Sequence, residues 1–115
     1  MTPSTMICRP GDVVLVPFIF TNLQQAKSRS AVVLSVDAYN STRPDVVMMP
    51  LTSQDSRIPG DAAVMDWHAA GLARPTYFKA CVQTIDRAAM KSRLGVLSAA
   101  DLETAYSSVR SIFGL

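Results

Sequence analysis

The stretch that decides the fold is GDVVLVPFIFTNLQQAKSRSAVVLS, residues 11–35. Its two apolar runs are rich in Val, Ile and Phe, residues that favour β-strands, and a polar segment separates them. We therefore predict strands at 11–21 and 31–38, joined by a polar connection that carries Lys27 and Arg29. Because Pro17 has no backbone N–H, the first strand should bulge or lie at a sheet edge near it.

Three further apolar runs extend the β pattern. They predict strands at 45–51, 62–66 and 77–84, and the short segment WHAAGLARP (67–75) predicts a single helical turn. Five short strands within the first 84 residues indicate a small barrel-like sheet.

The end of the chain changes to a helical pattern. Ser98 followed by Asp101 is a helix start signal, in which the hydroxyl and the carboxylate can each accept an N–H of the first turn. Gly114 supplies a stop. Apolar residues recur between them at three- and four-residue spacing: Leu102, Ala105, Tyr106, Val109, Ile112 and Phe113. The predicted fold class is mainly β with a C-terminal amphipathic helix laid on the barrel.

Length and composition limit the number of domains and the kinds of partner that we expect. The chain has 115 residues, 49% hydrophobic and 17% charged, so residues 1–115 should form a single packed domain. A formal net charge of +2 allows nucleic-acid binding only at a local site. The sequence has no secretion signal and no apolar run near the roughly 18 residues of a membrane span. We therefore expect a soluble, cytoplasmic protein that does not contact a membrane.

Several chemistries lack support in the sequence. Cys8, His68 and Cys81 lie far apart, without the paired spacing of a zinc site, so no metal and no disulfide is expected. No glycine-rich nucleotide-binding motif and no G-x-S-x-G motif occurs, so no cofactor is expected.

Polar and basic groups do gather where strands meet loops. Arg29 leads into the second apolar run, and LTSQDSR (51–57) leaves the third. This second segment offers the side chains of Thr52, Ser53, Gln54 and Arg57. A guanidinium beside a hydroxyl suits a phosphodiester, because both donate hydrogen bonds to its oxygens. By spacing alone, these residues fit an ordinary solvated loop equally well.

Three pieces of the chain together resemble one known family. GDVVLVPFIFTNLQQAKSRSAVVLS, PLTSQ and DWHAAGLARPTYFKACVQTIDRAAMKSRLGVLSAADLE run in the order and spacing of the MazF/PemK family of type II toxins. The resemblance covers nearly the whole chain. It implies an SH3-like barrel with a C-terminal helix, a homodimer, and a metal-independent endoribonuclease that cuts single-stranded RNA at short sequences. It also implies a cognate antitoxin that blocks the RNA groove.

The resemblance assigns roles to particular residues. Arg29 matches the family's arginine at the second strand, and Thr52 matches its threonine after the third; these are the predicted catalytic residues. In RNA cleavage the 2′-hydroxyl attacks the adjacent phosphorus, and the enzyme stabilises the added charge. Arg29 can neutralise that charge but is a poor base. The predicted RNA-binding residues are Gln25, Lys27, Ser53, Gln54, Arg57 and Lys79.

The chain departs from the family pattern at four places. Ser30 stands where the family has proline, and Gln24 where some members have glutamate. Phe78 and Ala80 stand where another branch has an R-x-D pair. These departures leave the general base unassigned. The remaining titratable candidates are Asp37, Asp55, Asp66 and His68.

Two alternatives stay open beside the ribonuclease. One is a gyrase-inhibiting toxin of the same barrel, although such toxins end in a tryptophan-containing tail and this sequence ends SIFGL (111–115). The other is a decayed member that only binds its antitoxin.

Other residues are predicted to be structural. We expect tight turns at Gly11 and Gly95, and a capped turn at Asp86. Trp67 should be a core or dimer anchor. Three methionines are expected to fill the core: Met48, Met49 and Met65.

Overall fold

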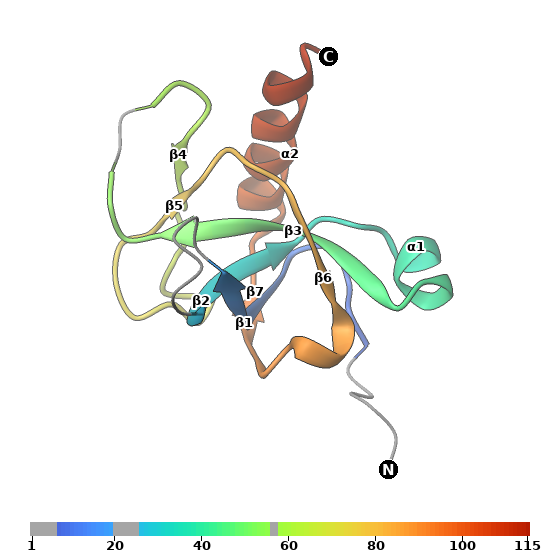
Figure 1. Ribbon diagram of the computed structural model, residues 1–115. Coiled ribbons are helices and arrows are strands. Elements are labelled where there is room, and N and C mark those ends of the chain that lie inside the picture. The colour runs from blue at the N-terminus through green and yellow to red at the C-terminus, as the bar shows by residue number, and fades with distance from the viewer. Residues whose placement is uncertain (1–6, 20–25, 56–57) are drawn as a thin grey trace.

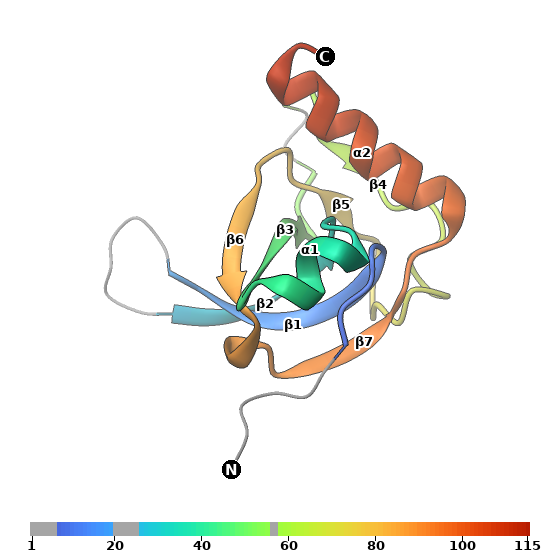
Figure 2. The same cartoon turned by 90° about the vertical axis from the view of Figure 1, so that its right-hand side faces the viewer.

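The computed structural model describes residues 7–19, 26–55 and 58–115 (Figure 1). The elements are β1 (Asp12–Ile19), β2 (Ala26–Val33), α1 (Asp37–Thr42), β3 (Asp45–Thr52), β4 (Ala62–Ala63), β5 (Tyr77–Phe78), β6 (Gln83–Asp86), the 3-10 helix η1 (Arg87–Ala89), β7 (Ser92–Val96) and α2 (Ala99–Phe113). The strands pair antiparallel in the order β4-β5-β3-β2-β1-β7, and β6 also pairs with β3. Figure 2 shows this sheet strongly curled, with α2 outside it. The predicted fold class, mainly β with a C-terminal helix, is confirmed.

Alternation along the strands buries both faces of the sheet. Val13, Val32 and Met49 belong to one buried cluster, onto which Leu102 and Val109 of α2 pack. The intervening residues of the same strands form a second cluster: Val14, Val16, Ala31, Val33, Val46 and Met48, with Cys8 and Met90. Two-sided burial explains why these strands read as continuous apolar runs and not as alternating ones.

The second strand was predicted in the wrong place. The prediction was 31–38, whereas β2 spans Ala26–Val33 and residues 37–42 form α1. The polar residues at 26–30 are strand because they pair with β1, where Val16 lies opposite Arg29 and Pro17 opposite Ser28. Cross-strand pairing thus outweighs the low β-propensity of this polar stretch.

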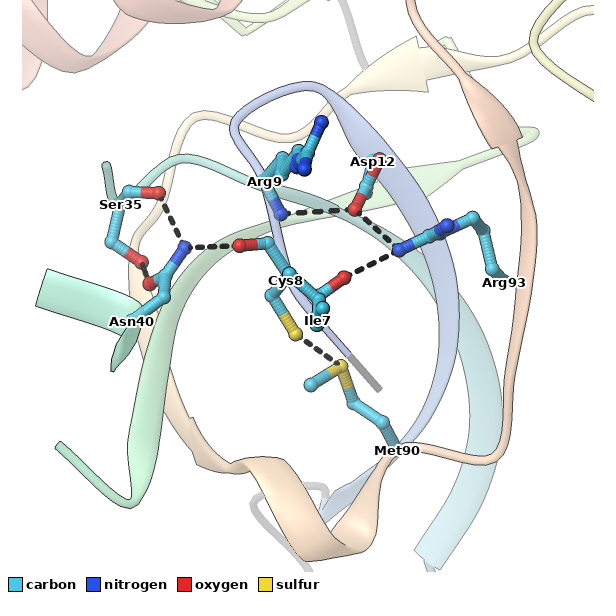
Figure 3. Close-up of polar contacts among 8 residues, drawn as sticks. All are labelled: Ile7, Cys8, Arg9, Asp12, Ser35, Asn40, Met90 and Arg93. Atoms are coloured by element: carbon cyan, nitrogen blue, oxygen red, sulfur yellow. Dashed lines mark hydrogen bonds and ion pairs between the residues drawn. The ribbon is translucent and has the colours of Figure 1, made fainter. Parts of the chain in front are cut away.

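A buried asparagine stabilises α1. Asn40 Nδ2 donates to the carbonyl oxygens of Ser35 (2.8 Å) and Cys8 (2.9 Å), and Ser35 Oγ donates to Asn40 Oδ1 (Figure 3). Because these bonds satisfy a side chain that is only 3% exposed, they fix the chain in a turn of helix where an extended strand was expected.

The segment before β1 is held by contacts with the end of the sheet. The Arg93 guanidinium donates to Asp12 Oδ2 (3.0 Å) and to the carbonyl oxygen of Ile7, and the Cys8 thiol lies 3.7 Å from the sulfur of Met90 (Figure 3). Cys8 is buried and Cys81 is half-buried, and the two are not joined by a disulfide.

The fourth and fifth predicted strands are shorter than expected. The fourth, predicted at 62–66, is reduced to β4. The N–H of Val64 still donates to the Thr76 carbonyl, but the next two amides donate to Asp101 and so leave the ladder. The fifth, predicted at 77–84, splits into β5 and β6. A turn between them bonds Cys81 N to Lys79 O at 2.7 Å.

Pro17 lies at a local sheet edge, as predicted. The strand β7, which was not predicted, pairs with β1 only over Asp12–Leu15 and so ends before Pro17. In the described part of the chain, Pro17 pairs only with Ser28 of β2. Its missing N–H therefore costs no ladder bond on the β7 side.

The caps of α2 are confirmed, with one correction. Ser98 Oγ accepts the N–H of Asp101 (3.1 Å), and Gly114 ends the helix with φ +71°. The Asp101 carboxylate was expected to accept from its own helix, but it accepts from the N–H groups of Met65 and Asp66. Met65 is 80% exposed, so its predicted core role is wrong.

The other structural assignments largely stand. Met48 and Met49 are fully buried, Trp67 packs against the core, and Gly11 occupies a turn with φ +92°. Asp86 accepts the N–H of Ala88 and begins η1. Of the helices that the structure describes, none is long and apolar enough to cross a membrane.

Candidate functional site

Arg29 and Thr52 lie on the same face of neighbouring strands. The β2–β3 ladder ends where Ala31 pairs with Pro50, and Arg29 and Thr52 are each two positions beyond that pair. Side chains alternate along a strand, so residues two apart share a face. The sheet register therefore brings together the two residues that were predicted to be catalytic.

A groove of about 480 Å³ opens beside this end of the β2–β3 ladder. Its lining residues are Leu15, Ser28, Arg29, Ser30, Leu51, Thr52, Ser53, Gly71, Leu72, Ala73, Arg74, Thr76 and Leu94. Five of them carry hydroxyl groups, two carry guanidinium groups, and among these lining residues none is acidic. Such a surface attracts an anion with several oxygen acceptors.

The hydroxyl of Thr52 is oriented by its own loop. Thr52 Oγ1 accepts the backbone N–H of Gln54 at 3.1 Å, which is the turn that a threonine commonly forms at a strand end. Since the oxygen accepts this bond, the hydroxyl proton is left to donate to a bound group. Ser53 lines the groove beside it and is exposed.

Arg74 is a groove residue that the sequence did not single out. It lies in the connection before β5, where the hydroxyl of Thr76 donates to the Arg74 carbonyl at 2.8 Å and Thr76 itself is buried. The available signal was the step Arg74-Pro75, since proline restricts the backbone and presents the preceding residue in a fixed direction.

A helical turn and two glycines position this connection. The N–H of Leu72 bonds the Trp67 carbonyl (3.1 Å) and that of Gly71 bonds the His68 carbonyl (3.1 Å), with Gly71 at φ +82°. This is the Schellman ending of a helical turn, so the single turn predicted at 67–75 is present. A Cβ on Gly71 would overlap the Leu94 carbonyl, and one on Gly95 would overlap the Ala70 carbonyl. Gly95 is therefore required for close backbone packing and not for the tight turn that was predicted.

Lys91 adds a third cation near the groove. Its Nζ donates to Ser28 Oγ at 2.7 Å, and its backbone N–H donates to the Leu15 carbonyl at 2.8 Å. Ser28 and Leu15 both line the groove. No sequence motif singles out Lys91, because its place near the groove depends on the pairing of β7 with β1.

Two of the other predicted RNA-binding residues do not line the groove. Gln54 and Lys79 are exposed and are not among the residues that line the groove. Lys27 pairs with Phe18 in the β1–β2 ladder. Gln25 and Arg57 lie outside the described residues.

The four titratable candidates for a general base are also elsewhere. Asp37 begins α1, Asp55 and Asp66 are exposed, and His68 lies edge-on to Trp67 at 5.7 Å between ring centroids. None of the four lines the groove. Across residues 7–19, 26–55 and 58–115, no three His, Cys, Asp or Glu residues are close enough to hold a metal ion.

Comparison with known families identifies the chain. Residues 9–113 match the model of the PemK-like, MazF-like toxins of type II toxin-antitoxin systems. The chain belongs to this family. A comparison with curated proteins gives no match.

Solved structures of PemK/MazF toxins share the fold. MazF of Deinococcus radiodurans is 23% identical with a TM-score of 0.77, and the match covers 96% of this chain and 99% of that one. An endoribonuclease from a mycobacterial species, solved in complex with its cognate antitoxin, is 20% identical with a TM-score of 0.76, over 93% and 95% of the two chains. MazF-mt6 of Mycobacterium tuberculosis is 18% identical with a TM-score of 0.75, over 93% and 98%.

The departures from the PemK/MazF pattern have structural explanations. Phe78, at one position of the R-x-D pair, is fully buried and pairs with Leu51, so this site is used for the core. The N–H of Ala80 donates to Asp61. Ser30 lines the groove, where it offers a hydroxyl that the family's proline lacks. Gln24 lies outside the described residues.

Proposed function

We propose that this PemK/MazF toxin is an endoribonuclease that cleaves single-stranded RNA at short sequences without a metal ion and inhibits translation in the cytoplasm. One observation carries the proposal: Arg29 and Thr52 lie on the same face of adjacent strands and both line a groove whose described lining has no carboxylate. Residues 1–115 act as a single toxin domain in this proposal.

The groove residues suit the chemistry of RNA cleavage. Attack of the 2′-hydroxyl on the adjacent phosphorus gives a cyclic phosphate and a 5′-hydroxyl product, and negative charge builds on the phosphate oxygens. Arg29 can bind two of these oxygens and neutralise the charge, while the Thr52 hydroxyl donates a third hydrogen bond. Donors that are already in place lower the barrier, because they need no reorganisation during the reaction.

Proton transfer from the 2′-hydroxyl needs a separate acceptor. Arg29 stays protonated at ordinary pH and cannot fill this role. Since the described lining of the groove contains no carboxylate and no imidazole, no general base is assigned.

The proposal includes two protein partners. A relative of the same fold was solved with its cognate antitoxin, and the Deinococcus radiodurans toxin was solved with MazE. By family likeness, we propose that this chain forms a homodimer and that a cognate antitoxin neutralises it by covering the groove.

Incubation of the purified protein with a long single-stranded RNA in EDTA tests the proposal. The expected result is a set of discrete cuts that Arg29→Ala or Thr52→Ala lowers about a hundredfold or more. Arg110→Ala is the control, because Arg110 pairs with Glu103 on α2 and does not line the groove. Intact RNA with the wild-type protein, freed of antitoxin, would contradict nuclease activity and favour a binding toxin or a decayed member.

A further inference from the structure

The groove holds a second guanidinium group for which the proposed chemistry has no use. Arg29 from β2 and Arg74 from the 73–76 connection reach the same groove from separate elements, and Lys91 bonds to Ser28 on its wall. Positive charge from three side chains along one groove favours an extended ligand that carries more than one negative charge.

Arg74 differs from the arginines that have structural partners. Arg93 pairs with Asp12, and Arg110 pairs with Glu103. Arg74 forms no such ion pair with any carboxylate of residues 7–19, 26–55 and 58–115. It is exposed, so its side chain can reach a ligand without disturbing the core.

The backbone that carries Arg74 is held firmly. Thr76 bonds to the Arg74 carbonyl, Pro75 restricts the chain between them, and the Gly71 turn packs directly on the backbone of β7. A binding group on a fixed backbone loses less entropy when a ligand binds. These restraints on the backbone favour a binding role for Arg74.

From these observations we infer that Arg74 is a second phosphate-binding residue, which holds a backbone phosphate next to the scissile one and so positions the RNA strand in the groove. The inference rests on the proposed function for the identity of the ligand. Successive phosphates follow one another along a single strand, which matches two guanidinium groups on one groove. Since phosphate contacts carry no sequence information, Arg74 sets the affinity and register of the strand and leaves the cleavage sequence unchanged.

Two probes of identical mixed sequence test the inference. Binding is measured with a 2′-O-methyl RNA, which has no free 2′-hydroxyl and cannot be cleaved, and cleavage is measured with ordinary RNA. Arg74→Gln should weaken binding of the first probe about tenfold and reduce the slope of log K against log salt by about 0.7, the contribution of one contact to a single strand. It should raise KM with kcat changed less than about threefold, and cleavage should occur at the same positions.

Two further variants separate this effect from loss of net charge or of fold. Arg74→Lys keeps the charge and should recover most of the binding. Arg43→Gln removes an equal charge from an exposed arginine that stacks over Tyr39 and does not line the groove, so binding should stay within twofold of the wild type.

The outcomes distinguish this inference from the nuclease proposal. Equal binding by Arg74→Gln and Arg43→Gln would overturn the inference, even if the wild-type protein cleaves RNA. If the wild type binds the 2′-O-methyl RNA but cleaves nothing, the nuclease proposal fails, and weaker binding by Arg74→Gln still supports the inference. A wild-type protein that binds neither probe would overturn both.

Discussion

The carboxylate of Asp101 accepts the backbone N–H of Asp66 at 2.9 Å and joins the first turn of α2 to the segment after β4. Its other oxygen accepts the N–H of Met65 at 3.0 Å, and the residue is only 1% exposed. The side chain thus satisfies two amides that would otherwise continue β4. It ends that strand and fastens the helix to the sheet at the same time.

Replacing Asp101 should destabilise the fold. Asp101→Asn keeps the shape but turns an amide donor toward an N–H, so we expect a loss of about 2–3 kcal/mol in the free energy of unfolding, measured by urea denaturation. Glu103→Gln, two residues along the same helix, should cost less than about 0.5 kcal/mol, because its ion pair with Arg110 is exposed. Similar losses for the two variants would contradict the proposed role of Asp101.

Gly71 and Gly114 share a left-handed backbone but should respond differently to alanine. Gly71→Ala places a Cβ against the Leu94 carbonyl, so we expect a loss of at least about 3 kcal/mol in unfolding free energy and weaker RNA binding. Gly114→Ala meets nothing within 4 Å and should cost about 1 kcal/mol from backbone strain alone. Thermal or urea unfolding of both variants checks the difference. Equal costs would show that the 70–71 backbone can move away from β7.

The hydroxyl of Thr52, and not its bulk, should be needed for activity. Thr52→Val keeps the shape and removes the donor, so cleavage should fall about a hundredfold. Thr52→Ser retains the hydroxyl and the bond from Gln54 N, and should stay within about tenfold of the wild type. Rates measured on one RNA under single-turnover conditions make the comparison. Equal activity of the valine and serine variants would remove Thr52 from the reaction.

Stability should fall at alkaline pH because of Cys8. Burial raises the pKa of the Cys8 thiol above its ordinary value of 9.0. The folded state therefore keeps a proton that the unfolded chain loses at lower pH. The stabilisation is complete below about pH 9 and is lost as the pH rises through the folded pKa.

Urea unfolding of the wild type and Cys8→Ala between about pH 7 and 10.5 tests this expectation. The wild-type free energy should drop more steeply above pH 9 than that of the variant, which has no thiol at this position. Parallel curves would show that Cys8 does not contribute to the pH dependence.

The sequence predicted correctly those parts of the fold that depend on residues close together in the chain. The apolar runs that became β1 and β3, the Ser98 cap and the Gly114 stop all follow from residue chemistry within a few positions. The predicted position of β2 was wrong, and β7 and α1 were not predicted, because all three depend on residues far away in the sequence. The strands β2 and β7 both pair with β1, and Asn40 of α1 donates to the Cys8 carbonyl.

The residues of the candidate site also fall into two groups, those that a sequence motif identified and those that only the structure placed in the groove. Arg29 and Thr52 were found from their motif, and the sheet register explains why they meet. Lys91 joins them through the pairing of β7 with β1, which no local sequence pattern predicts. Arg74 joins them through the packing of Gly71 on β7, and only the step Arg74-Pro75 offered a local signal for it.

The pairing of β1 with β7 also sets the order in which the protein can be completed. The ion pair of Asp12 and Arg93 joins residues 81 positions apart, and Leu15 meets Leu94 in the wall of the groove only after nearly the whole chain exists. At a synthesis rate of about 5–20 residues per second, the first strand waits several seconds for its last neighbour. A chain that is still being translated therefore lacks the β7 wall of the groove, and the binding surface is complete only after residue 94 has been added.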